Sequence, residues 1–147
     1  MKMPPKSKIY EAFSAIADGR INVKKNTAII KSSNKQKEYY VIWNDHQITS
    51  NDNATFWQKY PGYPIIAVWL KTKQISYDES VTKFFKNINW QEQNKKNKRN
   101  YEASVNEILN RLVEQNIDTE YIEQQVDDIY EQIEAISFEI VRKITKK

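Results

Sequence analysis

The period of the apolar positions changes several times along this chain. Ile9, Phe13, Ile16 and Ala17 recur at helical spacing, which predicts an amphipathic helix over residues 8–18. Over residues 21–50 the period is two, in short runs separated by polar, turn-forming segments. This stretch predicts an antiparallel meander of three or four strands. A meander placed between helical segments is typical of an α+β fold.

The next apolar segments read as further helices of the same body. Pro64 suits the first turn of a buried helix over residues 65–73. Ser76 and Glu79 have the spacing of a capping box, ahead of a helical stripe that runs to Ile88. Residues 91–100 are polar and basic and read as a connector, so we expect the α+β body to span residues 1–99.

Residues 100–147 are predicted to form a helical hairpin or coiled-coil arm. One apolar face covers residues 101–113, and Asp118 is placed to cap a second helix reaching about Ile144. At 1.5 Å per residue this helix would be roughly 40 Å long. Its apolar residues step at heptad spacing: Ile122, Val126, Ile129, Ile133, Ile136 and Ile140. Such a strip needs cover, either from a partner or from the body itself.

Composition narrows the classes of function. Aromatic residues make up 12% of the 147 residues, which indicates a folded chain. There is no cysteine for a disulfide or thiolate, and the two glycines cannot form a Gly-rich phosphate loop. The longest apolar run is residues 65–70, so we expect no signal peptide and no membrane partner. The lack of cysteine favours a cytoplasmic location.

Charge is distributed unevenly. Residues 114–139 contain nine acidic groups and no basic one, which leaves the rest of the chain with 23 basic against 10 acidic groups, or +13. The body either pairs with its own acidic arm or offers a surface to polyanions. A local cluster flanked by Trp90 and Tyr101 makes nucleic acid a possible partner, against the alternative of a solvated link: Lys95, Lys96, Lys98 and Arg99.

The candidates for catalysis are sparse. His46 is the only histidine and lies beside Asp45 in a predicted turn, where side chains usually point to water. The carboxylates of the acidic helix favour a solvated face over a divalent-metal site. We therefore predict no catalytic residue, no metal ligand and no cofactor; an enzyme of unrecognised type using Asp45, His46 or Asp52 is the third alternative.

One stretch, residues 28–74, resembles a SWIM-type zinc finger that has lost its metal, within a small uncharacterised prokaryotic-type protein. The resemblance rests on the segments Ile29–Ser33, Tyr39–Ile42 and Gly62–Leu70. The metal positions of the finger fall on Ser50, Asp52, Gly62 and Pro64, of which only Asp52 could ligate zinc.

The resemblance implies a ββα finger-like unit, and an association with DNA or protein binding within larger assemblies. In place of zinc, we expect Phe56, Trp57 and Tyr60 to pack as a staple between hairpin and helix.

The sequence thus favours a non-catalytic interaction module that self-associates or docks a protein partner through the strip of the C-terminal arm. The alternative is a nucleic-acid-binding protein that uses its basic body.

Overall fold

The computed structural model describes residues 1–144 and is a mixed α+β fold, as predicted. Its helices are α1 (Ser7–Ala17), the π-helix η1 (Ala54–Gln58), α2 (Tyr63–Lys71), the 3₁₀ helix η2 (Glu79–Phe85), α3 (Trp90–Lys96), α4 (Tyr101–Glu114) and α5 (Thr119–Ala135). The strands are β1 (Ile21–Lys24), β2 (Thr27–Lys31), β3 (Glu38–Trp43), β4 (Gln47–Ser50) and β5 (Glu139–Ile140). Among the described residues no helix is long and apolar enough to cross a membrane.

The first four strands form the predicted antiparallel meander. Ala28 pairs with Val23 on one side and with Val41 on the other. The side chains that point inward along the strands are buried, as the period of two requires: Ala28, Ile30, Val41 and Ile48. The outward positions Ile29, Tyr40 and Ile42 are exposed.

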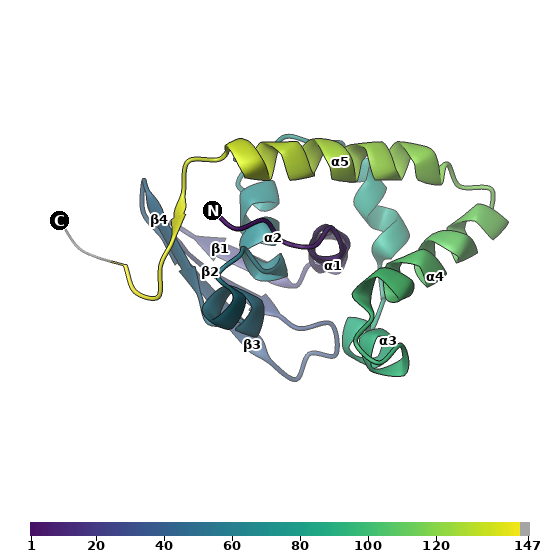
Figure 1. The fold of residues 1–147 in the computed structure, drawn as a ribbon, viewed down its shortest axis with the longest axis horizontal. Helices are drawn as coiled ribbons and strands as arrows, with labels where there is room; N and C mark the ends of the chain where they lie inside the picture. Colours follow the sequence, from purple (N-terminus) through teal and green to yellow (C-terminus); the bar gives the residue numbers. More distant parts are fainter. Residues whose placement is uncertain (145–147) are drawn as a thin grey trace.

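Helices α1 and α2 pack together, and α2 contacts strands of the sheet (Figure 1). Phe13 and Trp69 are among the largest fully buried side chains in this layer. Figure 1 shows α5 crossing over α1 and α2, with α3 and α4 at the end away from the sheet. One cluster of buried side chains includes residues from Ile9 to Ile133, so the C-terminal helices share the core of the body.

The predicted length of the last helix is wrong. Helix α5 begins after the predicted cap, where the Asp118 carboxylate accepts a hydrogen bond from the Tyr121 amide, but it ends at Ala135. Ile136 is extended, and Phe138 then packs on Trp69 with ring centroids 5.9 Å apart. The chain continues as β5, which pairs in parallel with β4. The open edge of β4 offers unpaired backbone N–H and C=O groups, and pairing with them replaces the helical hydrogen bonds of this segment.

The C-terminal helices also differ from the predicted coiled-coil hairpin. They diverge from their short link (Figure 1), and both contact α1. Polar contacts hold α5 to the segment before η2: the Gln125 side chain accepts from the Asp78 amide at 2.8 Å, and Gln132 bonds to both backbone groups of Ser76. The apolar faces of α4 and α5 therefore pack into the core of the body, and the two helices also contact each other.

The segment before η2 is capped differently from the prediction. Asp78, and not Ser76, is the N-cap, and its carboxylate accepts a hydrogen bond from the Ser80 amide at 3.0 Å. The predicted connector after it contains α3, capped by the Asn89 side chain, which accepts from the Glu92 amide. Both are consistent with the preference of Asp and Asn for N-caps.

Candidate nucleic-acid interface

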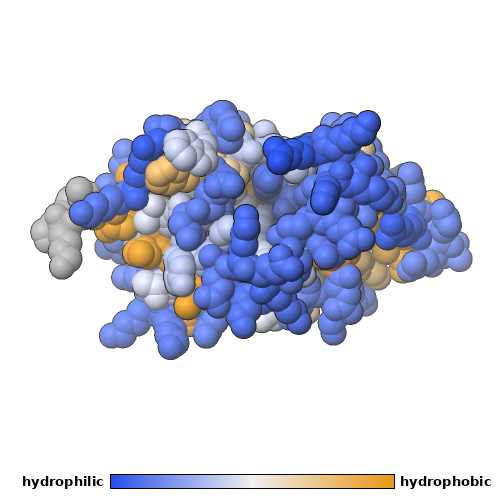
Figure 2. All heavy atoms as spheres, turned by 90° about the horizontal axis from the view of Figure 1, so that it is seen from below, coloured by the Kyte–Doolittle hydropathy of each residue, from blue (hydrophilic) through white to orange (hydrophobic). Residues whose placement is uncertain are grey.

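A cleft of about 900 Å³ opens between α1, the β2–β3 hairpin, η1 and α3. Five basic and two acidic side chains line it, a net formal charge of +3. Six aromatic side chains share the lining: Tyr39, Trp57, Tyr60, Tyr63, Trp90 and Tyr101. Figure 2 shows the molecule from below, where hydrophilic side chains dominate and apolar ones appear as separate spots.

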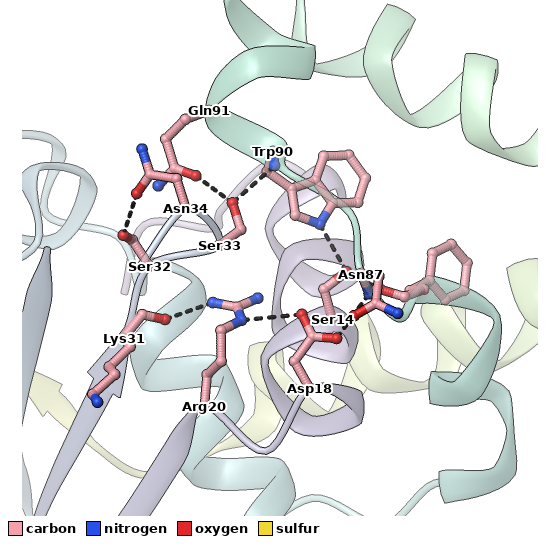
Figure 3. A network of polar contacts seen from close by, with 11 residues as sticks. Ser14, Asp18, Arg20, Lys31, Ser32, Ser33, Asn34, Asn87, Trp90 and Gln91 are labelled. Carbon is pink, nitrogen blue, oxygen red and sulfur yellow. Dashed lines mark hydrogen bonds and ion pairs between the residues drawn. The ribbon is translucent and has the colours of Figure 1, made fainter. Parts of the chain in front are cut away.

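The wall formed by α3 is positioned by a network of polar contacts (Figure 3). The Trp90 indole N–H donates to Ser14 Oγ on α1 at 2.8 Å, and the Trp90 amide donates to Ser33 Oγ in the β2–β3 hairpin at 2.8 Å. Ser33 Oγ in turn donates to Gln91 Oε1. These bonds attach the start of α3 to two separate elements, which fixes the direction in which the helix carries Lys95 toward the cleft.

The same network ties the end of α1 to the sheet. The Arg20 guanidinium pairs with Asp18 at 3.1 Å and donates to the Lys31 carbonyl at 2.5 Å, while Asp18 also accepts from the Asn87 amide at 2.8 Å (Figure 3). Arg20 is only 6% exposed, and Asp18 and the Lys31 carbonyl are the partners of its Nε and Nη1 atoms. The pair holds the sheet, α1 and the segment before α3 in one arrangement.

The predicted basic cluster divides between two surfaces. Lys95, Lys98 and Arg99 line the cleft. Lys96 instead pairs with Glu107 on α4, with 2.9 Å between Nζ and Oε1. Hydrogen bonding from Lys96 holds the pKa of the Glu107 carboxyl below its usual range. Three of the four predicted phosphate contacts are therefore brought together with aromatic side chains.

The cleft also contains two basic residues that the sequence did not single out. Lys37 lies in the β2–β3 hairpin and is exposed. Lys8, on α1, rests over the Tyr101 ring with Nζ 4.5 Å from the centroid. Its apolar stem is covered by the protein while its ammonium group faces an aromatic ring, an arrangement that favours a cation at this point.

Glu11 lies one helical turn from Lys8 and is only 7% exposed. Its Oε2 is 3.8 Å from Lys8 Nζ, too far for a hydrogen bond. Burial raises the pKa of the Glu11 carboxyl, with Lys8, Arg20 and a hydrogen bond from the Asn94 side chain opposing that shift. Glu11 Oε2 and Asn94 Oδ1 are buried acceptors without a hydrogen-bond partner among the described residues.

Asp52 organises the loop that borders the other side of the cleft. Its carboxylate accepts from the Thr55 amide at 3.1 Å and from Thr55 Oγ1 at 2.8 Å, and from Ser50 Oγ. Thr55 Oγ1 accepts from the Gly62 amide at 3.0 Å. A Cβ on Gly62 would lie 2.0 Å from Asp52 Oδ2, so only glycine fits.

The predicted aromatic staple is wrong for Trp57, which is 64% exposed. Its ring packs edge-on against Phe56, and the Arg142 guanidinium lies 4.6 Å from the Phe56 centroid. The buried Asp52 network, which needs no bulky side chain, holds the loop instead. Trp57 is thereby left at the rim of the cleft.

The residues predicted to bind a protein partner lie mostly in the core. Ile122, Val126, Ile129 and Ile133 are at most 1% exposed, and Ile136 and Ile140 are partly buried against the same core. The apolar strip is therefore covered by the protein's own body and not by a partner.

The remaining catalytic candidates are not gathered in one place. Asp45 and His46 are exposed in the β3–β4 turn, whereas Asp52 is buried beside the cleft. Within residues 1–144 no group of three or more His, Asp or Glu side chains is arranged to hold a metal ion.

Sequence reasoning missed Lys8, Glu11 and Lys37 because each lies far along the chain from the basic cluster. Asn94 directly precedes Lys95, but a neutral amide beside a basic run carries no signal of its own. Only one signal could have drawn attention to Glu11: it is a charged residue two positions before Phe13 on a largely apolar helix. The position of Lys8 one turn earlier fits a helical ion pair, which by itself indicates a surface contact.

Comparisons with known proteins revise the resemblance given above. The model of a family described as Uncharacterised conserved protein UCP014422 matches residues 1–139. Comparisons with curated proteins and with solved structures gave no match. The resemblance to a SWIM-type finger is wrong: its apolar pattern reflects a strand hairpin followed by a buried helix, a combination that many folds share. Since the matching model covers nearly the whole chain, the protein belongs to the family UCP014422.

Proposed function

We propose that this protein binds single-stranded nucleic acid in the cleft between α1, η1 and α3. The observation that carries the proposal is the meeting of basic and aromatic side chains in one hollow large enough for nucleotides. Lys95, Lys98 and Arg99 would contact phosphates, and exposed rings such as Trp57 would stack on unpaired bases. Single-strand-binding surfaces combine these two kinds of contact.

The proposal prefers nucleic-acid binding, the alternative in the sequence analysis, to docking of a protein partner through the C-terminal strip. Docking a partner through the strip of α5 would require Ile129 and its neighbours to leave the core. The cleft needs no such opening, because its cationic groups are already at the surface: Lys37, Lys95, Lys98 and Arg99 are all exposed.

The acidic face of α5 leaves the cleft largely uncompensated. Among residues 1–144, its ion pair with the body is Lys6–Asp127, with 2.8 Å between Nζ and Oδ1, and both side chains are more than half exposed. Such surface pairs contribute little. The basic groups of the cleft therefore keep their attraction for phosphates.

The test is fluorescence anisotropy with a labelled heptauridylate, titrated at several salt concentrations. Each phosphate neutralised contributes about −0.7 to the slope of log K against log salt. Changing Lys95, Lys98 and Arg99 together to Gln should weaken binding and flatten the slope by about 2 units.

A variant of equal charge loss separates the cleft from general electrostatics. Lys24, Lys71 and Lys86 are exposed and do not line the cleft, so changing these three to Gln should leave most of the affinity. Equal loss in both triple variants, or duplex RNA bound as tightly as the single strand, would contradict the proposal, because neither result requires bases in the cleft.

A further inference from the structure

Three polar side chains that line the cleft, Lys8, Glu11 and Asn94, contact one another in its floor. Glu11 contacts both of the other groups: its Oε2 lies 3.8 Å from Lys8 Nζ, and the Asn94 side chain hydrogen-bonds to it. Lys8 is a donor, whereas the unsatisfied atoms of Glu11 and Asn94 are acceptors, Oε2 and Oδ1. Along this chain of contacts, from Lys8 through Glu11 to Asn94, the order is donor, acceptor, acceptor.

Buried acceptors without partners are costly, and folded proteins rarely keep them without a reason. Two of them, on neighbouring side chains that line the same cleft, point to a ligand that brings N–H groups. The aromatic ring of Tyr101 beside Lys8 supplies a flat surface next to these acceptors. A planar ligand with adjacent N–H donors fits both features.

We propose that the cleft recognises guanine, with Lys8, Glu11 and Asn94 reading the Watson–Crick edge of the base. Along that edge guanine presents the O6 acceptor, the N1–H donor and the N2 amino donor, which is the complement of donor, acceptor, acceptor. Uracil presents acceptor, donor, acceptor. Cytosine begins with a donor and ends with two acceptors, and adenine lacks a second donor, so each of the other bases leaves at least one group of the floor unmatched.

Lys8 is the residue that moves. In the free protein its ammonium group lies 4.5 Å from the centroid of the Tyr101 ring and 3.8 Å from Glu11 Oε2. A base that stacks on Tyr101 takes this place, and the flexible lysine stem lets the ammonium follow the O6 atom. The N1–H group then gives Glu11 Oε2 the partner it lacks, which offsets the cost of its burial.

An arginine side chain of a protein partner also carries adjacent N–H donors. The net formal charge of +3 around the cleft opposes a guanidinium cation. The same charge attracts a base that is joined to phosphates. Nucleic acid is therefore the better match to the whole cleft.

This inference rests on the proposed single-strand binding, and the experiment separates the two. Anisotropy is measured with heptauridylate and with versions whose central base is guanine, adenine, cytosine or inosine. The single guanine should raise affinity about 10-fold over uridine, within the range of a good bidentate base contact. Inosine lacks the N2 amino group and should fall between them.

Two variants locate the effect. Glu11→Gln and Asn94→Ala should each reduce the ratio of guanine to uridine affinity to about 2-fold or less. Glu92→Gln is the matched control for charge, since Glu92 is exposed on α3 and does not line the cleft. The test does not depend on the folding of the Glu11 variant. Asn94 is only partly buried, so its truncation provides a second variant. The comparison of guanine with inosine uses the unaltered protein.

Equal affinity for all the oligonucleotides, lost in the triple Gln variant of the basic cluster, would overturn the guanine site and keep the proposed function. No binding of any oligonucleotide would overturn both. Competition by N-acetylarginine amide but not by GMP would show that the floor takes a guanidinium, and would also overturn the guanine site.

Discussion

Changing Ile129 on α5 to Ala tests whether this helix belongs to the core. Ile129 is 0% exposed. The substitution removes three carbons, and at about 0.8 kcal/mol per buried methylene the lost transfer free energy is about 2.4 kcal/mol. The cavity left behind adds to this value, and buried Ile→Ala substitutions generally cost about 2–5 kcal/mol. We therefore expect the free energy of unfolding to fall within that range.

The assay is urea unfolding followed by circular dichroism, at two protein concentrations a hundredfold apart. A native chain of this size is stable by about 5–15 kcal/mol, so the loss should move the midpoint clearly. Val113→Ala on α4 is the control, because Val113 is 55% exposed and its truncation should change stability by no more than about 0.5 kcal/mol.

The dependence on concentration decides what covers the strip. If α5 packs on its own chain, the midpoint is the same at both concentrations for the wild type and the variant. A midpoint that rises with protein concentration, together with a loss of less than about 1 kcal/mol for Ile129→Ala at the lower one, would refute the reasoning, because the strip would then be covered by a second chain.

Four further predictions follow from particular contacts. Gly62→Ala should destabilise the protein by about 1–3 kcal/mol in thermal unfolding, because its Cβ would collide with the Asp52 carboxylate; an unchanged melting temperature would contradict the closeness of the two. Trp57→Ala should change the unfolding free energy by no more than about 0.5 kcal/mol, since the ring is 64% exposed, yet weaken heptauridylate binding by about 1–3 kcal/mol; a large loss of stability would restore the staple. Burial raises the pKa of Glu11 in the folded state, so between the two pKa values the folded chain holds a proton that the unfolded chain has released. The free energy of unfolding should therefore fall as pH rises from the ordinary glutamate range through the raised pKa. This fall should be absent in Glu11→Gln, and identical pH profiles of the two proteins would contradict the raised pKa. Asp118→Ala removes the cap of α5 and should cost about 1 kcal/mol, measured by urea unfolding; no measurable loss would mean that the helix end is satisfied in another way.

The local pattern was sufficient for most elements of the fold. The period of two located the four antiparallel strands, and helical spacing located α1, α2 and α4. Asp118 was identified as a cap because capping involves only neighbouring residues. The end of α5 was missed because the apolar spacing continues through Ile136 and Ile140. Those two positions satisfy the helical period by coincidence. After Ala135 the chain instead packs Phe138 on Trp69 and pairs with β4 as strand β5.

The candidate site was predicted only in part, for a related reason. Lys95, Lys98 and Arg99 could be recognised as a cluster because they are neighbours in sequence. Lys96 is in the same cluster but turns to Glu107, a choice that depends on where α4 lies. Lys8, Glu11 and Asn94 join the cleft through the packing of α3 against α1, which the bond from Trp90 to Ser14 fixes.

The sequence by itself determined which faces of this protein are apolar, where its strands and most of its helices begin, and which functions its composition does not supply. The tertiary structure decided what covers each face. The strip on α5 has the same spacing whether a partner or the body covers it, because periodicity reports only the geometry of a single helix. Burial at Ile129, the basic and aromatic cleft, and the unpaired acceptors of its floor all arise from contacts between residues far apart in sequence. Such contacts depend on the packing of whole elements, which no local pattern encodes.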